Sequence, residues 1–285
     1  MDDQAKRLRN RLNRPIMKAK TIAIVSGKGG VGKSNTALNF ALELQNRGKS
    51  VLLIDLDVGM GNIDILLGND AKYSIAHLFN DFTALHDIIE LGPYNLSYIA
   101  GGSSLNELMQ LDDVKLNYFF DQYEKAVNEY DYILLDLGAG VDTNSMSFIL
   151  ASDECIVITT PEPTSITDAY SMIKHILLRR SNIPIYVIMN RCDRTQNGEK
   201  MLEKFKQIIY QFLKTDIIKM GLLPNDPTVQ EAVIQQTPYI VYDGKAPVSK
   251  ALKEIVTNYL KCSHELNEIK PLSFIQRLKR LLVTR

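Results

Sequence analysis

The chain has 285 residues, of which 45% are hydrophobic and 23% charged, and its 33 basic and 33 acidic side chains leave a net charge of zero. This length suffices for one sizeable α/β domain or two small ones, and the charge balance favours neither nucleic acid nor an acidic partner. The 3 cysteines lack C-x-x-C spacing, which argues against a zinc site, and no segment approaches the ~20 apolar residues of a membrane span.

Short, almost continuously apolar segments alternate with segments of helical periodicity along the chain. The predicted strands are 21–26, 51–55, 96–100, 132–136, 154–160, 185–190 and 217–222. The predicted helices are 35–47, 112–128, 143–151, 165–179, 198–213, 227–236 and 247–261. This alternation is typical of an α/β fold with a doubly wound, mostly parallel sheet and helices on both faces. Ligands of such folds bind at the carboxyl ends of the strands.

Residues 27–34, between the first predicted strand and helix, read G-K-G-G-V-G-K-S. They fit the phosphate-loop pattern G-x-x-x-x-G-K-[ST], in which backbone N–H groups and a helix N-terminus surround phosphates. Lys33 is expected to neutralise the β- and γ-phosphates, and the Ser34 hydroxyl to ligate Mg²⁺. A glycine-rich turn that binds nothing is the alternative, although such a turn needs neither side chain. The predicted nucleotide-binding residues here are Gly29, Gly30, Val31, Gly32, Lys33, Ser34 and Asn35.

A second lysine, Lys28, directly follows the first glycine of this loop. On chemistry alone it is either a solvated loop lysine or a cation that points toward the nucleotide of a second copy. The string K-G-G-V-G-K-S resembles the deviant phosphate loop of the MinD/ParA ATPases. The resemblance implies a P-loop NTPase of the SIMIBI class that uses ATP/ADP and Mg²⁺ and hydrolyses ATP weakly as a homodimer. It also implies that Lys28 is a catalytic residue acting across the dimer.

Acidic residues follow the second and fourth predicted strands. Asp55 and Asp57 are two residues apart, so on an extended chain they point the same way, and they can hold Mg²⁺ and orient an attacking water. An Asp pair that caps a turn is the alternative. The string D-x-D-x-G-x-G-N resembles the first switch of the MinD group, which implies that Asp57 positions the water. Asp136 follows four apolar residues, as in a Walker B strand, and is predicted to support the metal together with Ser34 and Asp55.

Two later segments are candidates for base recognition. Asn190 and Arg191 end the sixth predicted strand and resemble the N-[KR]-x-D element of related hydrolases, so Asn190 is expected to bond the purine and Arg191 to stack on it. Pro224 and Asp226 lie in a string that resembles the family loop over the adenine, although simple turns explain both segments equally well. Chemistry alone leaves ATP or GTP open, and the resemblance favours ATP. Residues 159–170 also resemble the MinD group, where this region lines the dimer face.

The C-terminal segment 264–285 is predicted to be an amphipathic helix outside the ATPase domain at 20–263. Its apolar residues fall at helical spacing opposite basic ones, which is typical of a helix that lies on an anionic membrane surface. MinD uses such a helix, and a helix docked on its own domain is the alternative. We therefore expect a cytoplasmic protein held reversibly at the inner face of the cell membrane. The predicted membrane residues are Phe274, Ile275, Leu278, Leu281 and Leu282.

Residues 1–19 form a basic N-terminal arm, for which a disordered tail is the simplest interpretation. Within it, D-Q-A-x-x-L-R resembles the signature of the FlhG family of flagellar number and placement regulators. The resemblance implies that the arm activates the SRP-type GTPase FlhF and that flagellar C-ring and basal-body proteins are partners. The neutral core and the apolar stripe near Leu281 argue against a specific nucleic acid as a partner. A MinD-type regulator of cell division and a ParA-type DNA-segregation ATPase are the alternatives. The partner-activating residues are predicted to be Asp3, Gln4, Ala5, Leu8 and Arg9.

Overall fold

The computed structural model describes residues 18–57, 62–102, 113–140, 143–265 and 273–283. The strands in these ranges are β1 (Lys20–Val25), β2 (Val51–Leu56), β3 (Glu90–Leu91), β4 (Ser97–Ile99), β5 (Tyr132–Leu137), β6 (Glu154–Thr159), β7 (Ile185–Cys192) and β8 (Ile218–Pro224). The described strands form one sheet in the order β3-β4-β2-β5-β1-β6-β7-β8. Every neighbouring pair is parallel except β3 and β4. The predicted fold class is confirmed.

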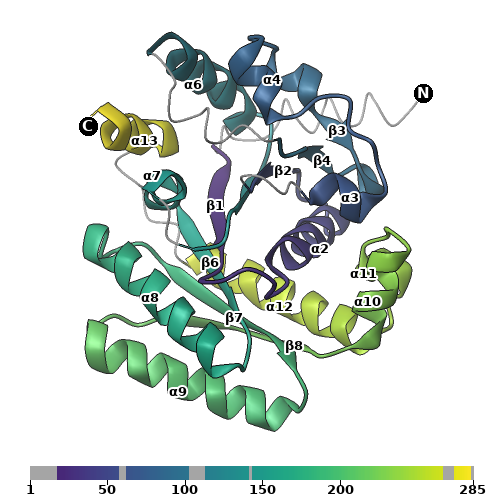
Figure 1. Cartoon of the computed structure of the whole chain (residues 1–285), viewed down its shortest axis with the longest axis vertical. Helices are drawn as coiled ribbons and strands as arrows, with labels where there is room; N and C mark the ends of the chain where they lie inside the picture. Colours follow the sequence, from purple (N-terminus) through teal and green to yellow (C-terminus); the bar gives the residue numbers. More distant parts are fainter. Residues whose placement is uncertain (1–17, 58–61, 103–112, 141–142, 266–272, 284–285) are drawn as a thin grey trace.

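Helices cover both faces of the sheet (Figure 1). One face carries α2 (Lys33–Asn46), α3 (Ile63–Leu67), α10 (Pro227–Ile234), α11 (Tyr239–Tyr242) and α12 (Pro247–Glu265). The other carries α4 (Ile75–Asn80), α6 (Asp113–Val127), α7 (Thr143–Ala151), α8 (Pro163–Arg179), α9 (Thr195–Leu213) and α13 (Phe274–Val283). Successive residues of a strand face opposite sides, so Ile22 and Ile24 enter one core and Ala23 and Val25 the other. This double burial explains why the strands read as continuous apolar runs.

The segment between β2 and β4 contains elements that periodicity did not predict. It holds α3, α4, the two-residue strand β3 and the 3₁₀ turns η1 (Leu85–Ile88) and η2 (Pro93–Asn95). Each is too short to show a repeat of 3.6 or 2 residues, and such elements depend on packing against the rest of the chain. The other predicted elements are present with shifted ends. In particular, α12 continues to Glu265, so the domain boundary predicted at 264 lies inside a helix.

The last helix, α13, lies against α6 and α7 (Figure 1). Phe274 stacks on Tyr123 with ring centroids 4.6 Å apart, and Leu278 is fully buried. Arg277 donates from Nη2 to Asp153 Oδ1 at 2.7 Å and from Nε to the last carbonyl of α7 at 2.6 Å. The apolar stripe of α13 is therefore covered by its own domain in this structure. None of the helices in the described ranges is both long and apolar enough to cross a membrane.

Candidate functional site

The glycine-rich loop joins β1 to α2 at the carboxyl edge of the sheet (Figure 1). Gly30 and Gly32 have φ angles of 77° and 88°, in the left-handed region that glycine adopts without strain. At Gly27 a side chain is excluded, because a Cβ there would lie 2.2 Å from the carbonyl carbon of Asp168 in α8. The loop is therefore shaped by its glycines and packed against α8. Its backbone leads directly into the N-terminus of α2, as a phosphate site requires.

Lys33 lies in a buried cluster of carboxylates at the end of the central strands. Its Nζ is 2.7 Å from Asp136 Oδ1 and 3.3 Å from Asp57 Oδ2, and it donates to Ser34 Oγ at 3.2 Å. Burial works to lower the pKa of Lys33, but the carboxylates, with Asp136 foremost, outweigh burial and raise it. The structure thus brings together the lysine, the hydroxyl and two of the acids that the sequence predicted as one site.

Asp55 holds the start of the loop that follows β2. Its Oδ1 accepts from the backbone N–H of Asp57 at 3.0 Å, and its Oδ2 accepts from the N–H groups of Asn62 and Ile63 at 2.8 and 3.2 Å. Burial, together with the neighbouring Asp136 carboxylate, raises the pKa of Asp55 to about 7. Asp55 is therefore anchored to the segment that the sequence identified as a switch.

The surroundings of the Asp136 carboxylate are suited to a bound magnesium ion, because one of its buried oxygens lacks a partner among the described residues. Asp136 is fully buried, and its Oδ2 has no hydrogen-bond partner in the described part of the chain. An unsatisfied buried oxygen is costly, and a hydrated cation beside the Ser34 hydroxyl would satisfy it. The described residues contain no group of three His, Cys, Asp or Glu side chains arranged as a metal cage. Mg²⁺ needs no such cage, because it takes one or two carboxylates and completes its shell with phosphates and water.

The Lys28 side chain contacts residues at the start of α8. Its Nζ forms an ion pair with Glu162 Oε2 at 2.6 Å and donates to Thr164 Oγ1 at 3.1 Å. The hydrogen bond and charge of Lys28 lower the pKa of Glu162. Glu162 is 59% exposed, and an exposed pair of this kind contributes little to stability. Sequence reasoning missed Glu162, although it lies inside the string that resembled the MinD group.

A cavity of about 870 Å³ extends from the loop toward α10. It brings together the predicted residues Gly32, Asn35, Asn190, Arg191, Pro224 and Asp226. Asn190 does not present its amide freely, because Nδ2 donates to Val31 O at 2.8 Å and Oδ1 accepts from the N–H of Arg191 at 2.9 Å. In this structure Asn190 therefore fixes the phosphate loop to the end of β7, and its contact with the purine stays a prediction.

The acids beside this cavity are also engaged within the protein. Asp226 caps α10 by accepting from the N–H of Thr228 at 3.0 Å, and its other oxygen accepts from the N–H of Val248 at 3.1 Å. Asp193, the last residue of the N-[KR]-x-D element, accepts from Asn225 Nδ2 at 3.0 Å. The cavity wall is thus built by hydrogen bonds among its own residues.

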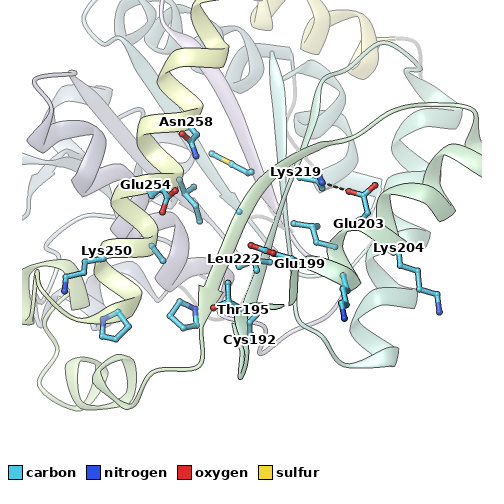
Figure 2. Close-up of a pocket in the computed structure, with 18 of the residues that line it drawn as sticks. Cys192, Thr195, Glu199, Glu203, Lys204, Lys219, Leu222, Lys250, Glu254 and Asn258 are labelled. Atoms are coloured by element: carbon cyan, nitrogen blue, oxygen red, sulfur yellow. Dashed lines mark hydrogen bonds and ion pairs between the residues drawn. The ribbon is translucent and has the colours of Figure 1, made fainter. Parts of the chain in front are cut away.

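A larger cavity, of about 1140 Å³, lies along β8 between α9 and α12 (Figure 2). Lys219 and Glu203 form an ion pair at its rim. It includes Cys192 and Pro224 but neither the phosphate loop nor the buried acids. Volume therefore does not identify the candidate site here. The smaller cavity is the one that contacts the phosphate loop.

The structure describes the predicted membrane residues but not the predicted partner-activating residues. The partner-activating residues Asp3, Gln4, Ala5, Leu8 and Arg9 lie outside the described residues. Of the membrane residues, Phe274, Ile275 and Leu278 are buried, and Leu281 and Leu282 are partly buried against the same core.

Known proteins share both the sequence and the fold. A family model described as an AAA domain matches residues 19–185. The antiactivator FleN of Pseudomonas aeruginosa is 32% identical over 232 residues, which cover 81% of this chain and 82% of FleN. The chain belongs to this AAA-domain family as a MinD/ParA-type P-loop ATPase. A second relative of this ATPase, the flagellum site-determining protein YlxH of Helicobacter pylori, is 33% identical over 244 residues, 82% of each chain.

The solved structures of MinD/ParA ATPases agree with this assignment. The septum site-determining protein MinD of Pyrococcus horikoshii, complexed with Mg-ADP, superposes with a TM-score of 0.70. The two chains are 25% identical, and the match covers 88% of this chain and 100% of the other. MinD/ParA ATPases hydrolyse ATP and form dimers. The predicted family is therefore confirmed.

Proposed function

We propose that this chain is an ATPase that pairs when it binds ATP, attaches reversibly to an anionic membrane and regulates flagellar number or placement. The proposal rests on the cluster of Lys33, Ser34, Asp57 and Asp136 beside the phosphate loop, in which Gly30 and Gly32 have positive φ angles. The flagellar part is supported by the likeness to FleN and to YlxH, whose name assigns it to flagellum site determination.

The cluster explains how the chain handles ATP. In the structure Lys33 neutralises Asp136 and Asp57, and phosphates in the loop would draw its ammonium group away from these acids. Asp136 and Asp55, with the Ser34 hydroxyl, would then hold Mg²⁺. The bound ion would offset the charge of the phosphates. Asp57, the most exposed of the three acids, would orient the attacking water.

Lys28, the second lysine of the phosphate loop, is expected to act when two copies of the chain form a dimer. Within the described residues, the Lys28 ammonium group contacts the exposed Glu162 carboxylate and the Thr164 hydroxyl, so a phosphate group of a second copy can compete for it. We propose that Lys28 leaves Glu162 when two ATP-bound copies meet face to face. Residues near Glu162, at the start of α8, would then lie in the interface.

The nucleotide dependence of the molecular mass tests the core of this proposal. We expect the full chain to elute as a dimer with Mg-ATP and as a smaller species with Mg-ADP in size-exclusion chromatography with light scattering. A Lys33→Ala variant is the control, because without the loop lysine it should elute as the smaller species with either nucleotide. A wild-type protein that shows one mass with ATP, ADP and no nucleotide would contradict the proposal.

We propose that α13 is the membrane contact, and that it must leave its docking site on α6 and α7 to act. Its apolar residues, now largely covered, would insert into the surface, and its basic residues would face anionic headgroups. Arg277 favours the docked state, because it is largely buried against Asp153 and the end of α7. Arg280 is exposed, and in this scheme its charge faces the anionic headgroups.

Two charge-removing variants of α13 are therefore expected to act in opposite directions on vesicle binding. Arg280→Gln should weaken co-sedimentation with phosphatidylglycerol vesicles roughly 5-fold, since one surface-near basic residue contributes about 1 kcal/mol. Arg277→Gln removes the same charge but should strengthen binding, because it breaks the contact that retains the helix. Equal losses in both variants, or no binding by the wild type, would argue against the release of α13. Phosphatidylcholine vesicles control for charge-independent binding.

A cell-division role of the MinD type is the second candidate, and the likeness to the MinD structure favours it. The N-terminal arm distinguishes the flagellar role from the cell-division role. We propose that residues 3–9 activate the SRP-type GTPase FlhF and that flagellar C-ring and basal-body proteins are further partners. A septum-placing protein would not need this arm.

A further inference from the structure

Several large apolar side chains are exposed on adjoining elements at one side of the molecule. The short helix α3 lies between the β3–β4 pair and α10 (Figure 1). On one flank Gln236, just beyond α10, donates to the Ile65 carbonyl at 3.3 Å. On the other flank a Cβ at Gly92 would lie 3.4 Å from the Leu67 side chain. We call this surface the α3 patch, and its apolar residues, each at least 42% exposed, are Ile65, Leu91, Tyr94, Val233 and Ile234.

The segments that form the α3 patch are acidic. The sequence of residues 62–70, 89–95 and 227–236 contains no lysine, arginine or histidine. The acids of these segments are Asp64, Asp70, Glu90 and Glu231. Burial raises the pKa of Tyr98, and the carboxylates of Glu90 and Asp64 raise it further, which shows that these two acids lie near the same buried ring. The α3 patch is therefore an exposed apolar surface with an acidic rim, and it is suited to an apolar segment that carries basic residues.

Residues 1–17 of the N-terminal arm have the matching composition. Ala5, Leu8 and Leu12 fall at helical spacing, so on a helix they would share one face. At the same spacing the basic residues fall on the other sides of that helix. The basic residues are Lys6, Arg7, Arg9, Arg11 and Arg14, against only two acids. The arm thus combines an apolar stripe with positive charge, which is the chemistry that the α3 patch lacks.

The arm is long enough to reach the α3 patch of its own chain. The described chain begins at Lys18, beside the amino end of β1, and β5 and β2 lie between β1 and β4. Neighbouring strands are about 4.8 Å apart, so β4 lies about 15 Å from β1. Leu91 is opposite Ser97, at the amino end of β4, and therefore near the same edge of the sheet as Lys18. Residues 13–17 alone span up to about 17 Å when extended, which leaves residues 1–12 free to form a helix on the patch.

We propose that residues 1–17 dock on the α3 patch of the same chain, with their apolar stripe on its exposed side chains and their basic residues toward its acidic rim. Docking withholds the arm from other proteins, so a partner that recognises the arm must displace it from the patch. The patch is also connected to the nucleotide site, because the N–H groups of Asn62 and Ile63, at the start of α3, are held by Asp55. Docking does not depend on which partner the arm recognises.

Hydrogen exchange of the full chain, followed by mass spectrometry, tests the docking. The amides of residues 2–14 are expected to exchange at least about 10-fold more slowly than those of a synthetic peptide of residues 1–17, because a docked arm exchanges only when it is released. The peptide accounts for any protection that the arm has by itself. The measurement needs neither nucleotide nor a partner, so its failure and the failure of the proposed function are distinguishable.

Two matched double variants locate the docking site. Leu91→Ser with Glu231→Lys removes an apolar side chain from the α3 patch and reverses a charge at its rim. Leu178→Ser with Glu254→Lys makes the same changes at comparably exposed positions on α8 and α12. The patch variant should return the arm to within about 2-fold of the exchange rate of the peptide, since it loses apolar contact and charge complementarity together. The control should exchange like the wild type, and thermal unfolding checks that both are folded.

Other results would overturn the docking. If the arm of the wild type exchanges as fast as the peptide, the α3 patch does not hold it. If the two double variants lose protection equally, or if neither loses it, the arm docks elsewhere. If protection falls when the protein is diluted about 10-fold, the arm docks on a second copy and not on its own chain.

Discussion

Asp57→Asn is expected to lower the ATP turnover of the full chain by about 100-fold or more, while the ATP-bound dimer persists. Asp57 is the one acid of the site with substantial exposure, at 22%, whereas Asp55 and Asp136 are fully buried. A water near the γ-phosphate can therefore reach Asp57. Asparagine keeps the shape of the side chain but loses the charge that accepts the proton. Lys33 retains its partner Asp136, so nucleotide binding should not be lost.

Phosphate release measures the turnover, and light scattering with Mg-ATP measures the dimer. Asp70→Asn is the matched control, because it removes an equal charge from an exposed position beyond α3. Normal turnover in Asp57→Asn would remove Asp57 from the catalytic role. Loss of both turnover and the ATP dimer would instead show that Asp57 supports nucleotide binding.

Much of the fold is predictable because the central strands are buried on both faces. The core segments of β1, β2, β5, β6 and β7 contain almost only apolar residues until the carboxyl end, where a polar residue appears. Parallel strands bring these ends to one edge, so Asp55, Asp136 and Asn190 were predicted to meet. The register confirms the principle, since Asp55 lies opposite Asp136 in neighbouring strands.

The state of the site was less predictable than its location. A phosphate loop in sequence suggests a lysine directed at phosphate, yet Lys33 contacts an acid 103 positions away. Likewise Asn190, although it lines the cavity, donates to the backbone of the loop at Val31. Such pairings depend on distances across the folded edge, which spacing along the chain does not contain. They also change with a ligand, because charged groups take the nearest opposite charge.

The C-terminal helix shows a different limit. An apolar stripe with a basic opposite face is equally typical of a helix on a membrane and of a helix on its own domain. The residues that hold α13 on the domain lie in other elements. They are the aromatic rings of Tyr123 and Phe148 and the carboxylate of Asp153. No pattern within residues 264–285 reports the presence of that surface.

A mixture of two inactive variants is expected to recover ATP turnover if Lys28 acts across the dimer. Lys28→Gln lacks the outer lysine but has a complete site otherwise, and Asp57→Asn lacks the water-positioning acid but can still donate Lys28. Each alone should form inactive sites. In a mixed dimer, the Lys28→Gln copy supplies Asp57 and its partner supplies Lys28, so one complete site forms. An equal mixture should reach about a quarter of the wild-type rate, since half of the dimers are mixed and each has one active site.

The same mixture distinguishes a role of Lys28 across the dimer from a role of Lys28 within its own copy. If Lys28 acted on the nucleotide of its own loop, neither site of a mixed dimer would be complete, and the mixture would stay inactive. Lys250→Gln, at an exposed position on α12, controls for the loss of a surface charge and should leave turnover unchanged. Glu162→Gln frees Lys28 from its partner in the isolated chain, so under the trans scheme it should favour the dimer at lower ATP concentration. An inactive mixture combined with an unshifted Glu162→Gln dimer would mean that the ion pair seen here is the working position of Lys28.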